Sequence, residues 1–145
     1  MKSFWNDAGR AATLERIQNV TPTSKARWGT MTAEAMLSHL AQTIRMATGE
    51  LPTKSKNLPL RYFPLKQLVI YLLPFPKGAP TAPELLVTSP ANVDATKIEL
   101  RRLMAEVAAY KGPFAEHPAF GRLSRNQYGI LMHRHFDHHL RQFGV

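Results

Sequence analysis

The sequence contains no cysteine. Disulfide-linked scaffolds, thiolate zinc sites and cysteine nucleophiles are therefore excluded, and any metal site must use histidine, aspartate or glutamate. A Gly-rich phosphate loop and a His-Glu-x-x-His motif are also lacking, so phosphate-binding loops and metalloprotease helices are not supported. With 145 residues, 44% of them apolar and 20% charged, the composition indicates one domain, residues 1–145, with a core of its own.

Long apolar runs are absent too. The most apolar segment, residues 65–75 (LKQLVIYLLPF), is too short to span a bilayer and has Pro74 near its end. The N-terminal MKSFWNDAGR has no apolar stretch after its lysine, unlike a secretory signal. We therefore expect a cytoplasmic protein without a membrane partner.

Acidic residues are scarce. The sequence has 10 Asp and Glu residues and 19 Lys and Arg residues, which gives a net charge of +9. Such an excess is typical of proteins that bind nucleic acid or acidic ligands. The basic residues are scattered, however, and no basic stripe interleaved with aromatic residues follows any segment. The pattern therefore argues against a nucleic-acid partner, which stays the weakest functional hypothesis.

Four segments have the periodicity and the end signals of helices. Gly49 is the expected end of the second, and Ser124 and Gln127 are spaced as a capping box at the start of the fourth. Asp7 is the expected cap of the first, and Ile98 belongs to the expected apolar stripe of the third. The expected spans are 7–20, from Thr30 or Thr32 to Gly49, from Asn92 or Asp94 to Lys111, and 124 to about 143.

Residues 50–91 differ from the rest of the chain because they hold eight of its eleven prolines. A structureless loop of this length is unusual in a compact domain. Its apolar part, residues 63–73, is expected to form a short helix with Pro64 in the first turn. The sequence thus predicts an all-α fold: a four-helix bundle with a long Pro-rich crossover, containing a short helix, between the second and third long helices.

Histidines gather at the end of the chain, where HRHFDHHLRQFGV (133–145) holds four of the six. At about 100° per residue, His135 and His139 lie one turn apart on the otherwise apolar side of the fourth helix, so both should face the interior. His133 and Asp137 fall on the opposite side and should face solvent. His138 lies at the edge between the two sides, near enough to compete as a ligand.

His39 is the only other histidine within an expected helix, and its apolar neighbours indicate that it also faces inwards. Three imidazoles from two helices would hold one divalent ion and leave positions open for water or substrate, as catalytic sites do. The predicted metal ligands are therefore His39, His135 and His139. Three imidazoles suit zinc, nickel, copper and iron alike, and a purely structural histidine pair stays open as an alternative.

Other polar residues offer weaker alternatives. Arg45, Arg141 and Gln142 could hold an anionic substrate near the ion, or could be solvated charges and caps of the helices. His117 lies in a Pro-flanked loop and could approach the rim of the site. Ser38 points away from the histidines on its helix, which argues against a serine nucleophile. No acidic residue can be placed beside the histidines as a general base, so catalytic residues stay unassigned.

Three stretches together resemble a known group of proteins: WGTMTAEAMLSHLAQTIRMATGE, FPLKQLVIYLLPFPKGAPTAPEL and HPAFGRLSRNQYGILMHRHFDHHLRQFGV. They resemble an uncharacterised family of the DinB/YfiT-like superfamily of metalloenzymes, and the likeness covers most of residues 28–145. The resemblance implies a four-helix bundle and a divalent metal, usually zinc or nickel. One histidine of helix 2 and two histidines four residues apart on helix 4 would hold it, and these positions match His39, His135 and His139.

The sequence departs from its relatives around these ligands. Relatives often carry Asn before the first histidine of helix 4, where this sequence has Arg134. They also continue with His-Arg-Gly-Gln, where this sequence has His139-Leu140-Arg141-Gln142. The ligands thus match, whereas the residues that would surround a substrate differ.

Characterised members of the superfamily handle low-molecular-weight thiols, which the metal is thought to bind and activate as thiolates. The resemblance therefore implies a metal-dependent enzyme, a thiol-dependent transferase or a hydrolase, with a small-molecule substrate and a low-molecular-weight thiol as cofactor. The alternative is a non-catalytic metal- or ligand-binding protein of the stress response. Relatives are often dimeric, so a homodimer is also expected.

Overall fold

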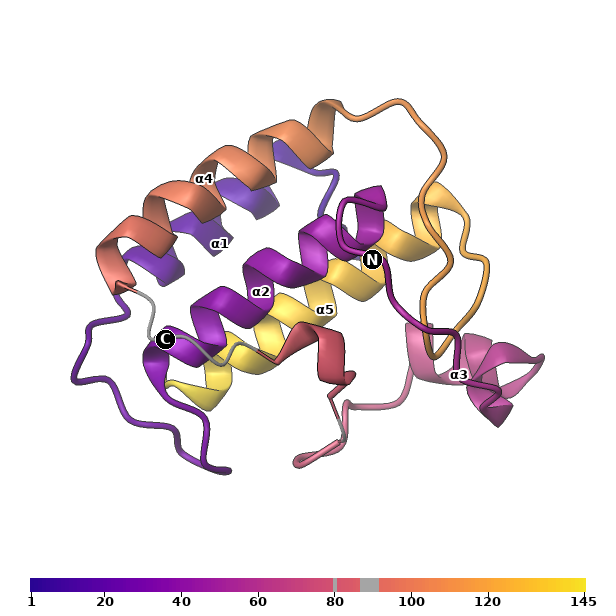
Figure 1. Ribbon diagram of the computed structural model, residues 1–145, viewed down its shortest axis with the longest axis horizontal. Coiled ribbons are helices and arrows are strands. Elements are labelled where there is room, and N and C mark those ends of the chain that lie inside the picture. The colour runs from indigo at the N-terminus through magenta and orange to yellow at the C-terminus, as the bar shows by residue number, and fades with distance from the viewer. Residues whose placement is uncertain (80, 87–91) are drawn as a thin grey trace.

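Helices make up the regular structure of the described part of the chain, residues 1–79, 81–86 and 92–145 of a computed structural model (Figure 1). The only β-type pairing there is an isolated bridge between His117 and Gly121. The expected all-α class is therefore confirmed. None of the described helices is long and apolar enough to cross a bilayer. The α-helices are α1 (Asp7–Gln18), α2 (Ala33–Thr48), α3 (Leu65–Tyr71), α4 (Val93–Ala109) and α5 (Arg125–Gln142), and the short 3₁₀ helices are η1 (Pro59–Arg61) and η2 (Pro83–Leu85).

The long helices begin at side chains that accept a hydrogen bond from the first turn. Thr32 caps α2, and Ser124 and Gln127 form the predicted capping box of α5. At α1 the predicted cap was wrong by one residue. Asn6 is the cap, because its side chain accepts from an N–H in the first turn, and Asp7 is the first helical residue.

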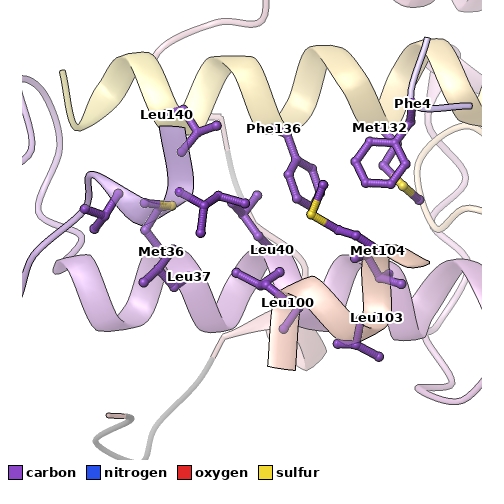
Figure 2. Packing of buried hydrophobic residues seen from close by; sticks show 14 of the residues in the cluster. Phe4, Met36, Leu37, Leu40, Leu100, Leu103, Met104, Met132, Phe136 and Leu140 are labelled. Atoms are coloured by element: carbon purple, nitrogen blue, oxygen red, sulfur yellow. The ribbon is translucent and has the colours of Figure 1, made fainter. Parts of the chain in front are cut away.

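The four long helices share one apolar core. α2 packs against α4 and α5, and α1 packs against the same two helices (Figure 1). Figure 2 shows the side chains that meet between them. Removing these side chains from water is the main force that holds the helices together. The largest of the fully buried ones are Phe4, Ile17, Met36, Leu37, Leu40, Ile44, Leu100, Met104, Phe136 and Leu140.

One apolar residue of α4 does not reach this core. Ile98, which its spacing placed in the apolar stripe, is 73% exposed. α4 turns Leu100, Leu103 and Val107 to the core, and Ile98 lies about 160° from Leu100 around the helix axis. The prediction for Ile98 was wrong because α4 contacts its neighbours through one side only.

Two described helices between α2 and α4 pack against the long helices, η2 against α2 and α3 against α5. Arg134 of α5 fastens α3, because its guanidinium donates to three carbonyls at the end of that helix, two of them at 2.6 and 2.7 Å. The short helix predicted within residues 63–73 is confirmed as α3. Residues 80 and 87–91 of the predicted crossover, with two of its prolines, lie outside the described residues.

Candidate metal centre

The three histidines predicted as ligands come together between α2 and α5. Nε2 of His135 lies 3.1 Å from Nε2 of His39 and 3.0 Å from Nε2 of His139. The ligand atoms of all three lie within 4.8 Å of one another. Helix geometry explains the grouping, because His39 is on the buried side of α2, while His135 and His139 project from adjacent turns of α5.

A backbone carbonyl of η2 fixes the orientation of His39. The residue is buried, and its Nδ1 lies 3.4 Å from the carbonyl oxygen of Leu85. A carbonyl can only accept a hydrogen bond, so Nδ1 carries the proton and Nε2 keeps its lone pair. The crossover thereby turns the basic nitrogen of His39 toward the two histidines of α5.

A relay of two hydrogen bonds fixes His139 in the same tautomer. Gln142 donates its amide N–H to the carbonyl oxygen of Trp28 at 2.9 Å. The other end of the amide, Oε1, lies 2.9 Å from Nδ1 of His139 and can only accept. Nε2 of His139 therefore also keeps its lone pair. Partners of this kind orient the ligating histidines of metal sites.

All three imidazoles are neutral in this environment, because burial disfavours the charged form. Burial lowers the pKa of His39 below its ordinary value and lowers the pKa of His139 to about 4. Burial also takes the pKa of His135 well below its ordinary value, and the neighbouring His139 and His39 add to this effect. The neutral imidazole is the form that binds a metal ion.

This donor set fits a divalent cation. Two of the three facing nitrogens hold lone pairs, so a single proton on Nε2 of His135 would satisfy at most one of them. Nitrogen ligands of one tetrahedral ion, each about 2.0–2.1 Å from it, lie about 3.3 Å apart. The distances of 3.0 and 3.1 Å between these nitrogens are close to that separation. One cation would be bound by all three nitrogens when the proton of His135 lies on its Nδ1.

The histidines line a cleft of about 610 Å³ with mostly apolar walls. No aspartate or glutamate is found among the described residues that line it. Lys56 is the single lysine or arginine among the described lining residues. Besides the three histidines, the lining includes Trp28, Met31, Thr43, Met46, Leu58, Leu60, Val69, Phe75, Leu85, His117, Phe120, Tyr128, Leu131, Met132, His138 and Gln142.

A comparison with known protein families assigns the chain to one of them. A family model described as "Protein of unknown function (DUF1569)" matches residues 6–144. The chain belongs to the DUF1569 family. The matched region runs from the cap of α1 to the end of α5, so it takes in the three histidines and the crossover. No curated protein and no solved structure matches the chain.

His138 lies beside the three histidines of the DUF1569 chain without joining them. It lines the cleft, and its ring centroid is 5.7 Å from that of Trp28 and 6.0 Å from that of Phe75. Burial lowers its pKa, and nearby Asp137 opposes the shift. His138 thus forms part of the aromatic wall of the cleft and is not one of the grouped nitrogens.

The side of α5 opposite the cleft packs against α1. Asp137 is half-buried there because it pairs with Arg16 of α1 at 2.8 Å and with Arg141 at 3.0 Å. His133, on the same side, is also half-buried. The prediction that Asp137 and His133 face solvent was wrong, because the helical wheel of α5 does not show where α1 packs.

The two arginines considered as substrate contacts are engaged elsewhere. Arg141 pairs with Asp137, and Arg45 pairs with Glu99 and with Glu50. Neither arginine is among the described residues that line the cleft. Both are helix charges, the alternative that the sequence left open. Gln142 does lie at the site, where its amide orients His139.

The crossover and the loop before α5 supply lining residues that the sequence did not point to. Phe75 and Leu85 come from segments without helical periodicity, so nothing local marks them as neighbours of α5. For His117 the sequence left two interpretations open, an ordinary loop residue or one that approaches the rim of the site, and the structure places it among the lining residues of the cleft. The only signal for His117 was its residue type beside Pro118.

Proposed function

We propose that this DUF1569 protein is a divalent-metal-dependent enzyme of the DinB/YfiT-like type, a four-helix bundle that holds zinc or nickel through His39, His135 and His139. The observation that carries the proposal is the orientation of the imidazoles. Leu85 and Gln142 fix two of them with Nε2 lone pairs that face the third. The mutual packing of α1, α2, α4 and α5 supports the bundle.

The proposed reaction transfers a group to a low-molecular-weight thiol or hydrolyses a small-molecule substrate. A divalent cation held by the three histidines would supply positive charge that lowers the pKa of a thiol or a water molecule. The chain supplies an apolar wall that excludes water and strengthens electrostatic interactions inside the cleft. His138 is the lining histidine whose ring nitrogens make no hydrogen bond to the described residues, so it is our candidate for moving a proton.

Metal analysis by mass spectrometry of the untagged protein tests the ligand set. We expect about one divalent ion per chain in the wild type and almost none in His135→Ala. His133→Ala is the matched control, because it makes the same change on the same helix at a half-buried position outside the cleft lining. Full metal content in His135→Ala, or an equal loss in both variants, would contradict the proposal.

An activity assay distinguishes an enzyme from the alternative, a non-catalytic metal- or ligand-binding protein. The metal-loaded protein is mixed with an aryl halide and each of a panel of thiols, and thiol consumption is followed. We expect a rate above that of His135→Ala with at least one thiol. A protein that holds its ion and yet turns over neither these pairs nor simple esters would be a non-catalytic metal- or ligand-binding protein.

A further inference from the structure

The loop between α4 and α5 contains a histidine that the proposed reaction has not used. His117 and Gly121 close this loop, since the N–H of each donates to the carbonyl of the other at 2.9 and 2.8 Å. Gly121 has φ +67°, a left-handed conformation that favours glycine. The carbonyl of Pro118 accepts from the N–H of Lys56 at 2.8 Å, which ties the loop to the crossover. His117 is therefore held on a constrained backbone.

The same loop fixes the tautomer of the His117 ring. Nδ1 lies 3.1 Å from the backbone N–H of Ala119 and 3.3 Å from that of Phe120. Both partners can only donate, so Nδ1 accepts and carries no proton. The proton of the neutral ring is consequently on Nε2, at the far end of the ring from the loop. Burial lowers the pKa of His117 to about 4, which keeps the ring neutral near pH 7.

His117 lies in the same cleft as the three histidines of the candidate metal centre. Its ring packs between Phe120 and Tyr128, with centroids 5.0 and 6.4 Å away. The hydroxyl of Tyr128 donates to the carbonyl of Ala115 at 2.8 Å. Among the described residues, Nε2 of His117 has no hydrogen-bond partner. This nitrogen is not one of the buried polar atoms without a partner, so it is open to solvent. A fixed, uncharged donor is thus left in the wall of the cleft, where a ligand can supply the acceptor.

We propose that Nε2–H of His117 binds a carbonyl or carboxylate oxygen of the ligand, which makes the substrate an apolar molecule with one oxygen acceptor. This inference rests on the proposed function, because the ligand would lie in the cleft of the metal centre. A neutral imidazole donor polarises a carbonyl without giving up its proton. The single cation among the described lining residues, Lys56, favours an acceptor with negative charge, and the apolar walls accommodate the remainder of the molecule.

Two substitutions at His117 separate its two ring nitrogens. His117→Asn places an amide oxygen near the position of Nδ1, so the N–H groups of Ala119 and Phe120 keep an acceptor while the donor to the cleft is lost. His117→Gln places an amide N–H near the position of Nε2 and gives up the acceptor for the loop. The first variant should fold like the wild type and bind the ligand poorly. The second should be the less stable of the two and should bind the ligand better.

Hexanoate is the probe, because it has a short apolar chain and one carboxylate, and pentanethiol, which has no oxygen, is its control. Affinities are measured by titration calorimetry on cobalt-loaded protein, whose visible absorption reports the metal separately. We expect His117→Asn to retain the cobalt spectrum, to bind hexanoate about 10- to 100-fold more weakly, and to bind pentanethiol as the wild type does. His117→Gln should recover part of the hexanoate affinity.

The outcomes distinguish this inference from the proposed function. Equal hexanoate affinity in wild type and His117→Asn, with the cobalt spectrum intact in both, would overturn the role of His117 and leave the metal centre standing. Absence of hexanoate binding to the wild type would overturn it as well. If no cobalt binds, the metal proposal fails, and the same hexanoate comparison on the metal-free protein still decides whether His117 is a donor.

Discussion

Phe136 and His135 are neighbours in sequence and lie in two different apolar spaces. Phe136 points into the core between the long helices, where it is fully buried and its ring lies 5.0 Å from that of Phe4 (Figure 2). His135 points into the cleft between α2, α5 and the crossover. The labelled side chains around Phe136 are all apolar, whereas the space around His135 contains polar groups held in one orientation by Leu85 and Gln142. The same helix therefore uses burial for stability on one side and for alignment of neutral bases on the other.

Substitutions at adjacent residues of α5 should therefore have different effects. Those that face the core should lower the stability of the fold, and those that face the cleft should impair the candidate metal site. Truncation on the core side removes apolar contacts and leaves a cavity, which lowers the free energy of unfolding. Truncation on the cleft side removes a base whose burial disfavours its charged form, so its main cost falls on the metal site. The predictions that follow test this separation, from the largest effect of a single side chain to the smallest.

Phe136→Ala should have the largest effect on stability. Removing a fully buried ring from the centre of the core costs about 3–5 kcal/mol of unfolding free energy, and urea titration measures it. The variant should bind as much metal per folded molecule as the wild type, because the three histidines stay in place. Phe136→Leu keeps most of the apolar volume and serves as the milder variant if Phe136→Ala does not fold. A cost below about 1 kcal/mol would contradict the assignment of Phe136 to a closed core.

The helices that build this core could be predicted because their signals are local. The capping box of Ser124 and Gln127 and the glycine at position 49 mark ends that the structure has at those places. Ile98 shows what these local signals do not predict, namely which side of a helix is buried. An apolar residue at helical spacing indicates a stripe, but the side that neighbouring helices cover depends on packing between distant segments, and one residue of offset turns a side chain by about 100°.

Acid should destabilise the metal-free protein, because the histidines that line the cleft resist protonation in the folded state. Burial lowers the pKa of His139 and of His117 to about 4, while histidine in an unfolded chain titrates near 6.5. Between these values the unfolded chain binds protons that the folded chain does not. The unfolding free energy therefore falls as the pH drops from about 6.5 to about 4, and these groups leave it unchanged above that window.

The size of the acid effect follows from the same values. Each pKa unit corresponds to about 1.4 kcal/mol, so either ring contributes on the order of 3 kcal/mol by pH 4. Urea titrations of the metal-free protein across this range measure the slope. His117→Asn removes one titrating ring and should flatten the slope by about its share, while Phe136→Leu should shift the whole curve without changing the slope. A flat profile in the wild type would show that the rings are not buried as described.

Gln142→Ala should weaken metal binding without abolishing it. The amide of Gln142 fixes the tautomer of His139, and loss of such a partner lowers metal affinity about 10- to 100-fold. Competition with a chelator measures the affinity. Arg141→Ala is the matched control, because Arg141 is the adjacent residue and pairs with Asp137 outside the cleft. An unchanged affinity in Gln142→Ala would mean that His139 does not depend on this hydrogen bond for its orientation.

The sequence could predict only those features of the candidate site that depend on spacing within a helix. The spacing of His135 and His139 on one helix, with His39 on an inward-facing side of another, is sufficient to bring three imidazoles together. Gln142, which sets the tautomer of His139, is also local, because it lies three residues further along α5. The groups that orient His39 and Gln142 are distant in sequence, since Leu85 comes 46 positions after His39 and Trp28 comes 114 positions before Gln142. Leu85 lies in the three-residue η2 and Trp28 in the loop before α2, and neither segment has a periodicity that connects it to the histidines.

Ile98→Ala should have the smallest effect. The side chain is 73% exposed on α4, so its truncation should change the unfolding free energy by no more than about 0.5 kcal/mol, and the better helix propensity of alanine offsets part of any loss. Leu100→Ala, two residues along the same helix and fully buried, should cost about 2–5 kcal/mol. A similar cost for both would mean that something covers Ile98. If that cost increased with protein concentration, the cover would be a second copy of the chain, which is the homodimer that the resemblance to dimeric relatives implies.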